Sequence, residues 1–441
     1  MIPRLDLSAH CDAALRGRTW EVRGRVLKAV GQVVEVEGLE ASVGSELEVE
    51  TPGGAVRLEV LGFRGPVLVA APLGATAGIA PGARVKLGLR AASVPVGEAL
   101  LGRILDAFGR PLDGGPVPVC TARAPLYGAP PPPFGRQPIE HPFESGVRVV
   151  DGLLPLGRGQ RVGLFAGAGV GKSTLLGMMS RNAKVDVVIV GLVGERGREV
   201  GDFVRNALGP EGLARSIVVA ATSDSPPLVR VRGAVVATAM AEHFRAQGKD
   251  VLLVMDSVTR YAMALREATL AAGEPPLTKG YTPTVFASLP ALLERAGCGK
   301  PGEGAITALY TVLVEGDDMS DPIADAVKGI LDGHIVLSRP LADRGIFPAV
   351  DILRSISRIA PDIAPPEQLR QVARIRELLA AHEEAADLLR IGAYVPGSDP
   401  RIDAARVAVP QVDGLVKQSP AEHVPRGASV AAVRDLAEAF A

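Results

Sequence analysis

The chain has 441 residues, too many for one ordinary domain, and a hydrophobic content of 47% provides for a large buried core. Lysine and arginine (48) nearly balance aspartate and glutamate (49), and aromatic residues make up only 4%. These values exclude a disordered chain and argue against nucleic-acid partners, which require a basic surface or aromatic rings that stack on bases. We therefore predict a globular protein of about three domains.

The cysteines and the N-terminal residues predict a cytoplasmic protein. Cys11, Cys120 and Cys298 are far apart and none lies in a CxxC pair, which favours free thiols in a reducing compartment. The N-terminal segment MIPRLDLSAHCDAAL lacks the basic start and apolar stretch of a signal peptide. Apolar runs such as Val187 to Val193 cover less than half of a membrane span, so we expect no transmembrane segment.

Residues 1–92 predict a small β-barrel preceded by a short leading segment. Short β-branched runs alternate with turns such as Pro52-Gly53-Gly54 at a spacing of roughly 8–12 residues. The predicted strands are 25–30, 32–36, 45–49, 55–61, 66–71 and 84–87. Barrels of this size often bind oligonucleotides, but Phe63 is the lone aromatic in the middle of this one. A packing or ring-forming role is therefore favoured over nucleic-acid binding.

Residues 93–365 predict a parallel-sheet domain. The proline run Ala129–Pro133 indicates a stiff connector within a loop segment at 120–140. From about Gly159, apolar runs alternate with helix-length segments, which is typical of a sheet covered by helices on both faces. The predicted strands are 162–165, 187–192, 217–221, 251–255 and 306–314, and the predicted helices include 172–181 and 230–247.

Residues 366–441 predict a helical domain. The positions that define one apolar face of a single long helix are Leu369, Val372, Ile375, Leu379, Ala386 and Leu389. No strand pattern follows it. The predicted fold class is therefore α/β, with an N-terminal barrel, a central phosphate-binding sheet domain and C-terminal helices.

The segment Ala166–Thr174, with the sequence AGAGVGKST, predicts a phosphate-binding loop. It follows an apolar strand and opens a helix, which is the context that such a loop requires. Lys172 would reach the β- and γ-phosphates of a nucleotide, and the Ser173 hydroxyl would bind Mg²⁺. The pattern in its strict form has glycine where Ala166 stands. The expected nucleotide-binding residues are Gly167, Ala168, Gly169, Val170, Gly171, Lys172, Ser173 and Thr174.

Acidic residues follow two further predicted strands. Asp256 ends the apolar run that begins at Val251, as expected of the carboxylate on the Mg²⁺ side of this fold. The cluster Gly194–Glu199 follows the run at 187–192, at the edge where such sheets bind ligands. From spacing alone this cluster has two interpretations: a helix start with acids on its dipole, or a site where Glu195 polarises water and Arg196 meets the γ-phosphate.

At these residues the sequence resembles the catalytic subunits of rotary-type ATPases, and within them the export ATPases of flagella and type III secretion injectisomes. The resemblance runs from about Val22 to Gln418 and implies a RecA-like central domain. Its most specific stretches are Pro95–Gly97, Leu101–Arg103, Phe165–Thr174, Gly194–Val200, Ala221–Asp224, Asp256–Arg260, Gly273–Pro276, Leu313–Met319, Leu331–Leu337 and Gly392–Asp399.

The resemblance implies further roles for individual residues. Lys172 and Glu195 match catalytic residues, and Arg196 matches an arginine that contacts the γ-phosphate. The remaining matches are Glu199 as an acid near Mg²⁺, Arg260 as an arginine near the same site, Phe347 as the aromatic that stacks on adenine, and Arg358 as an arginine finger. In this family the finger reaches the nucleotide of the neighbouring subunit, so an active site needs two chains.

Two details favour particular branches of the superfamily. Glu195 is present, whereas non-catalytic rotary subunits lack this carboxylate. The turn Gly392–Pro400 carries one acid, whereas the matching turn of ATP synthase β-type chains is densely acidic. The stretches Asp256–Arg260 and Gly280–Pro283 resemble flagellar more than injectisome sequences.

The implied function is hydrolysis of ATP to ADP and phosphate, with Mg²⁺, to promote unfolding or chaperone release of export substrates. The implied partners are further copies of the chain in a ring, expected to be a hexamer, together with stator and central stalk proteins, export substrates and chaperones. The expected location is the cytoplasmic face of a membrane-embedded export gate. The alternatives are an injectisome ATPase, an ATP synthase catalytic subunit, a hexameric RNA translocase and a non-enzymatic ring scaffold.

Overall fold

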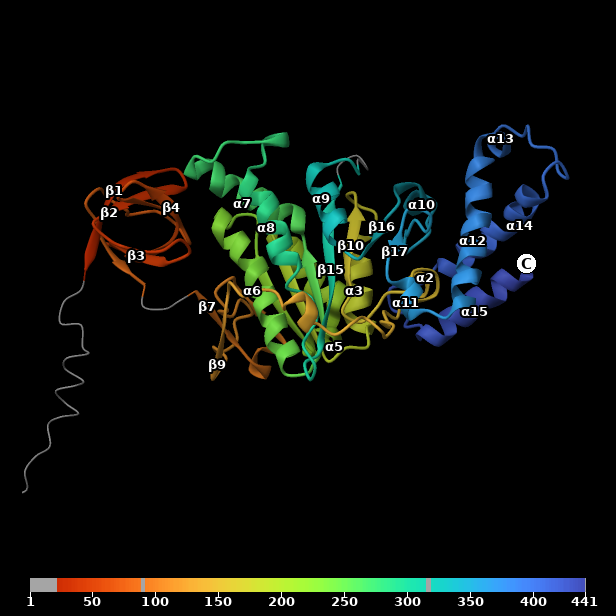
Figure 1. Ribbon diagram of the computed structural model, residues 1–441, viewed down its shortest axis with the longest axis horizontal. Helices are drawn as coiled ribbons and strands as arrows, with labels where there is room; N and C mark the ends of the chain where they lie inside the picture. Colours follow the sequence, from red (N-terminus) through yellow and green to blue (C-terminus); the bar gives the residue numbers. More distant parts are fainter. Residues whose placement is uncertain (1–21, 89–91, 315–318, 441) are drawn as a thin grey trace, which may run out of the picture. The chain divides into compact units, whose positions relative to one another are not determined.

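The computed structural model describes residues 22–88, 92–314 and 319–440, which belong to two compact units (Figure 1). One unit is the N-terminal barrel with the short segment Ala271–Glu274, and the other contains the central sheet and the C-terminal helices. Cys120 and Cys298 are free thiols, as predicted. Cys11 and the N-terminal segment assessed for a signal peptide lie outside the described residues.

The N-terminal unit is a closed antiparallel barrel with the strand order β1-β2-β5-β4-β3-β6. Buried positions alternate along β2, where Val34 and Val36 point inward and are fully buried. Phe63, the aromatic in the middle of the barrel, is exposed on β4. The strands are β1 (Arg23–Val30), β2 (Val33–Glu37), β3 (Glu46–Thr51), β4 (Gly54–Arg64), β5 (Val67–Pro72) and β6 (Arg84–Leu87).

The central sheet has the strand order β17-β16-β10-β15-β13-β11-β12-β8, and β14 pairs with β15. The inner strands are parallel, whereas β14 and β17 are antiparallel to their neighbours. The strands are β8 (Arg103–Leu105), β10 (Arg161–Ala166), β11 (Val187–Val193), β12 (Ser216–Ala221), β13 (Asp250–Asp256), β14 (Gly297–Cys298), β15 (Ala305–Leu313), β16 (Gly333–Val336) and β17 (Ile356–Ser357). The predicted inner strands are confirmed to within one residue at each end.

The loop predicted at 120–140 is partly wrong. β9 (Ala122–Pro125) pairs with β7 (Ser93–Val96) in a separate antiparallel ribbon. The run of alternating small and charged residues there carries no apolar pattern, so only its pairing with β7 makes it a strand. The proline run itself remains irregular up to a single 3-10 turn at Pro133–Gly135.

Helices cover both faces of the sheet. On one face, α6 (Pro227–Ala246) packs against β11, β12 and β13. Gly191 permits this close approach, because a Cβ atom there would lie 3.1 Å from the Cβ of Ala237. On the other face, α3 (Lys172–Asn182) shares an apolar core with Val188 and Val190 of β11.

The other helices of this unit lie between the strands in the sequence or come after the last strand. They are α2 (Arg148–Leu153), α4 (Gly197–Asp202), α5 (Gly209–Ala214), α7 (Val258–Ala272), α8 (Pro283–Leu293), α9 (Pro322–Ile330), α10 (Arg339–Asp343), α11 (Ala360–Ile363), α12 (Pro366–Glu384), α13 (Ala386–Arg390), α14 (Pro400–Val416) and α15 (Arg426–Ala439), with a π-helical segment at Phe203–Leu208. Among the described residues, no helix combines the length and apolar character needed to cross a bilayer.

The single long helix predicted near the C-terminus is wrong in its extent. α12 ends at Glu384, and the residues from Ala386 belong to the separate short helix α13. The buried face of α12 is Gln368, Val372, Ile375, Leu378 and Ala381, rather than the row that continues to Leu389. This face joins the core of the sheet, because Val372 and Ile375 belong to the same apolar cluster as Leu175 of α3. The predicted fold class is confirmed.

Candidate active site

The phosphate loop begins where β10 ends and leads directly into α3. Gly169 and Gly171 have φ angles of 76° and 89°, a backbone region that glycine adopts without strain. Lys172 and Ser173 occupy the first turn of α3, where free backbone N–H groups and the helix dipole favour an anion. The local sequence therefore builds the anion-binding geometry that the motif predicts.

Side chains from three strand ends converge beside this loop. Lys172 Nζ forms an ion pair with Asp256 Oδ1 and lies 3.6 Å from Glu195 Oε1. Arg260 Nε, in the first turn of α7, lies 3.2 Å from the same Glu195 oxygen. These residues meet because β10, β11 and β13 are parallel, so their carboxyl ends lie at one edge of the sheet. We call this edge the phosphate edge and these four residues the charged cluster.

The charged cluster lines a cavity of about 350 Å³, within the range of small-ligand sites. The predicted residues that line it are Gly167, Ala168, Gly169, Gly171, Lys172, Ser173, Thr174, Glu195, Glu199 and Asp256. Val170 does not line it, because its side chain is buried in the core. Arg196, Phe347 and Arg358 are also absent from its lining.

Phe347 lies beside the loop, although it does not line the cavity. Its ring would approach a Cβ atom on Gly171 to 3.3 Å, so the ring lies against the backbone at the start of α3. The side chain is 41% exposed, which leaves ring surface available for stacking. Its carbonyl accepts a hydrogen bond of 2.9 Å from the backbone N–H of Gln418, which ties this position to the C-terminal segment.

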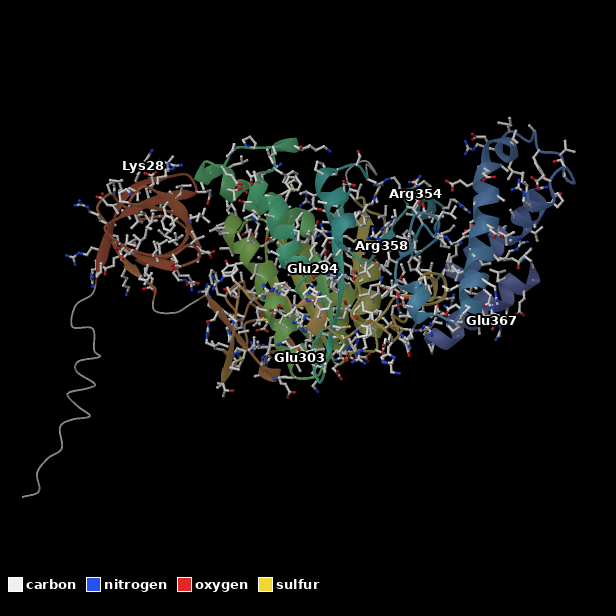
Figure 2. The ribbon with its side chains drawn as sticks, in the orientation of Figure 1. Lys28, Glu294, Glu303, Arg354, Arg358 and Glu367 are labelled. Carbon is white, nitrogen blue, oxygen red and sulfur yellow. The ribbon has the colours of Figure 1, made fainter. Side chains whose placement is uncertain are left out.

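The two remaining predicted arginines point elsewhere in this chain. Arg196 directly precedes α4 as its N-cap residue, its side chain is 78% exposed, and its guanidinium lies 3.7 Å from Glu199. Arg358, labelled in Figure 2, follows β17. It is exposed and donates a hydrogen bond of 3.2 Å to the carbonyl of Lys328. Its backbone N–H bonds the carbonyl of Asp332, just before β16, so it lies at the amino end of the parallel strands.

Comparisons with known proteins agree with this arrangement. The model of the ATP synthase alpha/beta family, nucleotide-binding domain, matches residues 146–357, and that of the T3SS EscN ATPase C-terminal domain matches residues 364–435. The flagellum-specific ATP synthase of Salmonella typhimurium is 52% identical over 90% of this chain and 89% of its own length. The type 3 secretion system ATPase of Xanthomonas euvesicatoria is 49% identical over 87% of this chain and 86% of its own.

A solved structure leads to the same family. The assembled ATPase EscN in complex with its central stalk EscO, from enteropathogenic E. coli type III secretion, has a TM-score of 0.86 and 41% identity. It covers 94% of this chain and 100% of its own. The chain belongs to the export ATPases of flagella and type III secretion. It is an ATPase, and the resemblance inferred from its motifs is confirmed.

Burial sets the protonation of the central carboxylate of this export ATPase. Glu195 is 8% exposed, and burial, together with a hydrogen bond that it shares with Glu199 and the negative charge of Asp256, raises its pKa to about 7. The shared hydrogen bond lowers the pKa of Glu199. The positive charges of Lys172 and Arg260 act against the rise. A carboxyl group in a ligand cavity whose pKa lies near neutral pH is suited to proton transfer or water activation.

Two residues that hold the site in place carry no signal in the sequence. Thr311 on β15 donates a hydrogen bond of 2.7 Å to Asp256 Oδ1 and so fixes this carboxylate from the neighbouring strand. It lies inside an apolar run and reads as an ordinary strand residue. Arg339, at the start of α10, donates a hydrogen bond of 2.8 Å to the carbonyl of Ala168 in the phosphate loop. Only the pairing of distant strands brings either residue to the site.

Proposed function

We propose that this chain hydrolyses ATP with the charged cluster to drive protein export in a flagellar apparatus. The observation that supports the site is the convergence of Lys172, Glu195, Asp256 and Arg260 around one cavity at the end of a phosphate loop. Phosphoryl transfer to water requires a basic residue that binds the phosphates and a carboxyl group that orients the water. Lys172 is such a basic residue, and Glu195, with a pKa of about 7, is such a carboxyl group.

The oxygen donors at the phosphate edge fit Mg²⁺. Ser173 and Asp256 offer a hydroxyl and a carboxylate, and Mg²⁺ is usually held by one or two such groups together with substrate phosphates and water. Among the described residues, no group of three or more metal-binding side chains forms a cage, which agrees with a metal that arrives with its nucleotide. Bound Mg²⁺ would neutralise charge on the phosphate oxygens. Glu199, which lines the same cavity, would act through water.

The residues of the chain then divide the reaction between them. Lys172 would exchange its contacts with Asp256 and Glu195 for phosphate oxygens. Glu195, released from Lys172, would orient a water molecule for in-line attack on the γ-phosphate and accept its proton. The Arg260 guanidinium, 3.2 Å from Glu195, would hold that carboxylate in place. Phe347 would stack on the adenine ring, and Arg196 would contact the γ-phosphate from the start of α4.

Arg358 would complete the site of a neighbouring copy. It is exposed and lies at the opposite end of the parallel strands from Lys172, so it is suited to contact between chains. The related EscN is an assembled ATPase bound to a central stalk protein. We propose a homo-oligomeric ring, a hexamer, whose partners are a central stalk, a stator, export substrates and their chaperones. The site of action would be the cytoplasmic face of the export gate.

The flagellar assignment is favoured over an injectisome by the relatives. The flagellum-specific relative is 52% identical and the type 3 secretion relative 49%. The injectisome remains the second candidate, because the C-terminal family model and the EscN structure belong to that system.

One experiment tests site and function together. We would purify the chain and its Lys172→Ala variant, measure phosphate release from ATP with and without Mg²⁺, and express both in a flagellated strain that lacks its own export ATPase. We expect Mg²⁺-dependent hydrolysis and restored motility with the wild-type chain alone. Full hydrolysis by folded Lys172→Ala would refute the site, whereas hydrolysis without export in flagellar and injectisome hosts alike would refute the export role.

A further inference from the structure

The outer side of the phosphate loop is held by an arginine. β16 runs parallel to β10, with Phe165 opposite Val336, and the pairing continues one residue further through a hydrogen bond of 2.8 Å from Leu337 to Phe165. The chain therefore leaves β16 next to the phosphate loop. Arg339, two residues later, donates the hydrogen bond from Nη2 to the carbonyl oxygen of Ala168.

This contact constrains the next backbone N–H of the loop. A trans peptide group is planar, so its C=O and its N–H point in opposite directions. Arg339 holds the C=O of Ala168 on its own side, and the N–H of Gly169 in the same peptide group must then point the other way. Arg339 lines a neighbouring cavity of about 470 Å³, whereas Gly169 lines the site cavity. The N–H of Gly169 therefore points away from Arg339, and Gly169 lines the cavity where phosphate would bind.

Gly169 has few contacts of its own that would fix its backbone. Its φ angle is 76°, and apart from its two chain neighbours no atom of the described residues lies within 4 Å of the position that a Cβ would take. A glycine without surrounding contacts can rotate its peptide groups more freely than any other residue. The hydrogen bond to the preceding carbonyl removes this freedom at one peptide group.

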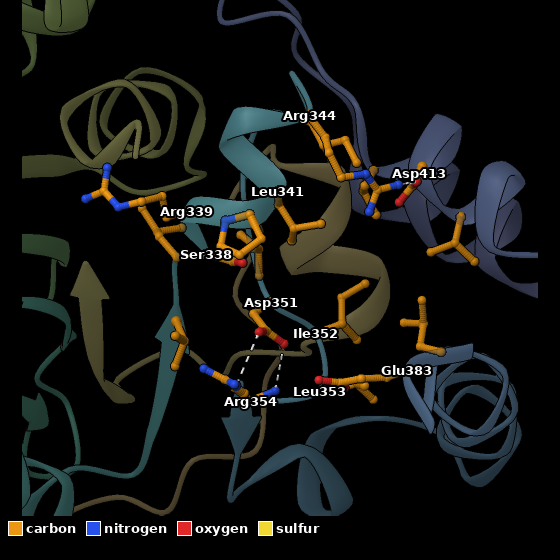
Figure 3. A pocket seen from close by; sticks show the side chains of 18 of the residues that line it. Ser338, Arg339, Leu341, Arg344, Asp351, Ile352, Leu353, Arg354, Glu383 and Asp413 are labelled. Carbon is orange, nitrogen blue, oxygen red and sulfur yellow. Dashed lines mark hydrogen bonds and ion pairs between the residues drawn. The ribbon is translucent and has the colours of Figure 1, made fainter. Parts of the chain in front are cut away.

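We propose that Arg339 is a positioning residue that pre-orients the phosphate loop for nucleotide phosphates. This proposal rests on the proposed active site. It adds a residue that touches no substrate and acts only through the Ala168–Gly169 peptide group. Figure 3 shows that Arg339 is turned away from Arg344 and Asp413, which form an ion pair at another part of the same cavity.

Arg339, which begins α10, and Arg344, which directly follows it, provide a matched test. Arg339→Met keeps most of the side-chain stem but removes the donor, and Arg344→Met does the same at a residue that lines the same cavity without touching the loop. We would measure dissociation constants for fluorescent ADP and ATP analogues, together with kcat and KM for ATP. Because the contact is exposed, we expect Arg339→Met to weaken binding of both nucleotides and to raise KM by roughly three- to tenfold, with a smaller change in kcat.

Two further variants separate the possible explanations. Arg339→Lys can still donate to the carbonyl and should restore part of the affinity, while Arg344→Met should bind nucleotide like the wild type. Unchanged affinity in folded Arg339→Met, or equal losses in Arg339→Met and Arg344→Met, would overturn the proposal. Lys172→Ala, measured in parallel, reports on the active site itself. If it loses hydrolysis while Arg339→Met behaves like wild type, only the role of Arg339 fails.

Discussion

The two ends of the parallel sheet differ in the burial and in the pairing of their charged side chains. At the phosphate edge, Lys172, Glu195 and Asp256 are largely buried, and each charge faces an opposite charge. At the other end, Arg358 is exposed and bonds only a backbone carbonyl through its side chain among the described contacts. The two ends lie roughly 17 Å apart along the strands, since β10 spans six residues of extended chain.

This difference indicates which part of the reaction a single chain can perform. In a buried ion-paired cluster, the fold of one chain supplies both partners of each pair, because a charge that leaves water needs an opposite charge beside it. An exposed arginine is still hydrated, and within the described part of the chain Arg358 forms no ion pair, so it can be paired by a group that another molecule supplies. The phosphate edge thus suits binding within one chain, and the opposite end suits contact between chains.

The largest expected effect comes from Arg358→Ala. If Arg358 acts on the nucleotide of a neighbouring copy, hydrolysis should fall by about a thousandfold or more, as for other arginine fingers. Nucleotide affinity should change little, because Arg358 does not line the cavity of its own chain. Arg354→Ala is the control: this arginine lies four residues earlier, is also exposed and pairs with Asp351 at 3.6 Å.

Mixing the variants tests the comparison directly. Lys172→Ala removes the lysine at the phosphate edge, and Arg358→Ala removes the arginine at the opposite end. A mixed ring would therefore contain some interfaces in which one subunit supplies an intact Lys172 and its neighbour an intact Arg358. We expect partial recovery of phosphate release at intermediate mixing ratios. Wild-type hydrolysis by Arg358→Ala alone would contradict the finger, and no recovery in rings shown to be mixed would contradict its action between chains.

Glu195→Gln should have the next largest effect. The amide keeps the size of the side chain but cannot accept the proton of the attacking water, so hydrolysis should fall on the order of a hundredfold or more. ATP affinity should stay near normal, which equilibrium binding would measure. Glu242→Gln is a matched control, since Glu242 is a mostly buried carboxylate paired with Arg295 outside the site. Turnover retained in Glu195→Gln would falsify the assignment.

Phe347 tests the expected contact with the adenine base, which the charged residues at the two ends of the sheet do not make. Phe347→Ala should raise KM for ATP roughly tenfold, because stacking on a base contributes about 1–3 kcal/mol. Phe347→Tyr keeps the ring and should behave like the wild type. Comparing ATP with inorganic triphosphate isolates the base: the loss should appear for ATP alone, and an equal loss for both ligands would point to a displaced phosphate loop instead.

The smallest expected effect is a shift in the pH profile. Glu195 must be a carboxylate to accept a proton, and its pKa is raised to about 7. The ratio kcat/KM should therefore rise with pH through about 7. Glu199→Gln removes the anionic partner that stabilises protonated Glu195, so the midpoint should move to lower pH. A profile that is flat between pH 6 and 8 would argue against Glu195 as the titrating group.

Several features of this protein follow from the sequence alone. The glycine spacing and position of Ala166–Thr174 specify a phosphate loop, because few other backbones need that pattern between a buried strand and a helix. The inner strands follow from apolar runs that are buried on both faces. The position of Asp256 at the end of an apolar strand indicates the edge of the sheet where ligands bind, whereas for Glu195 spacing alone leaves a helix start as an equal interpretation. Phe347 and Arg358 were found only through the family resemblance.

Tertiary structure decided the rest. The extent of α12, the strand β9 and the contacts of Thr311 and Arg339 all depend on partners that are far away in the chain, and no local pattern encodes such partners. The pKa of Glu195 likewise depends on how deeply the fold buries it and on which charges it places nearby. Local sequence determines which backbone each segment prefers, whereas burial and pairing between distant strands determine which side chains share a site.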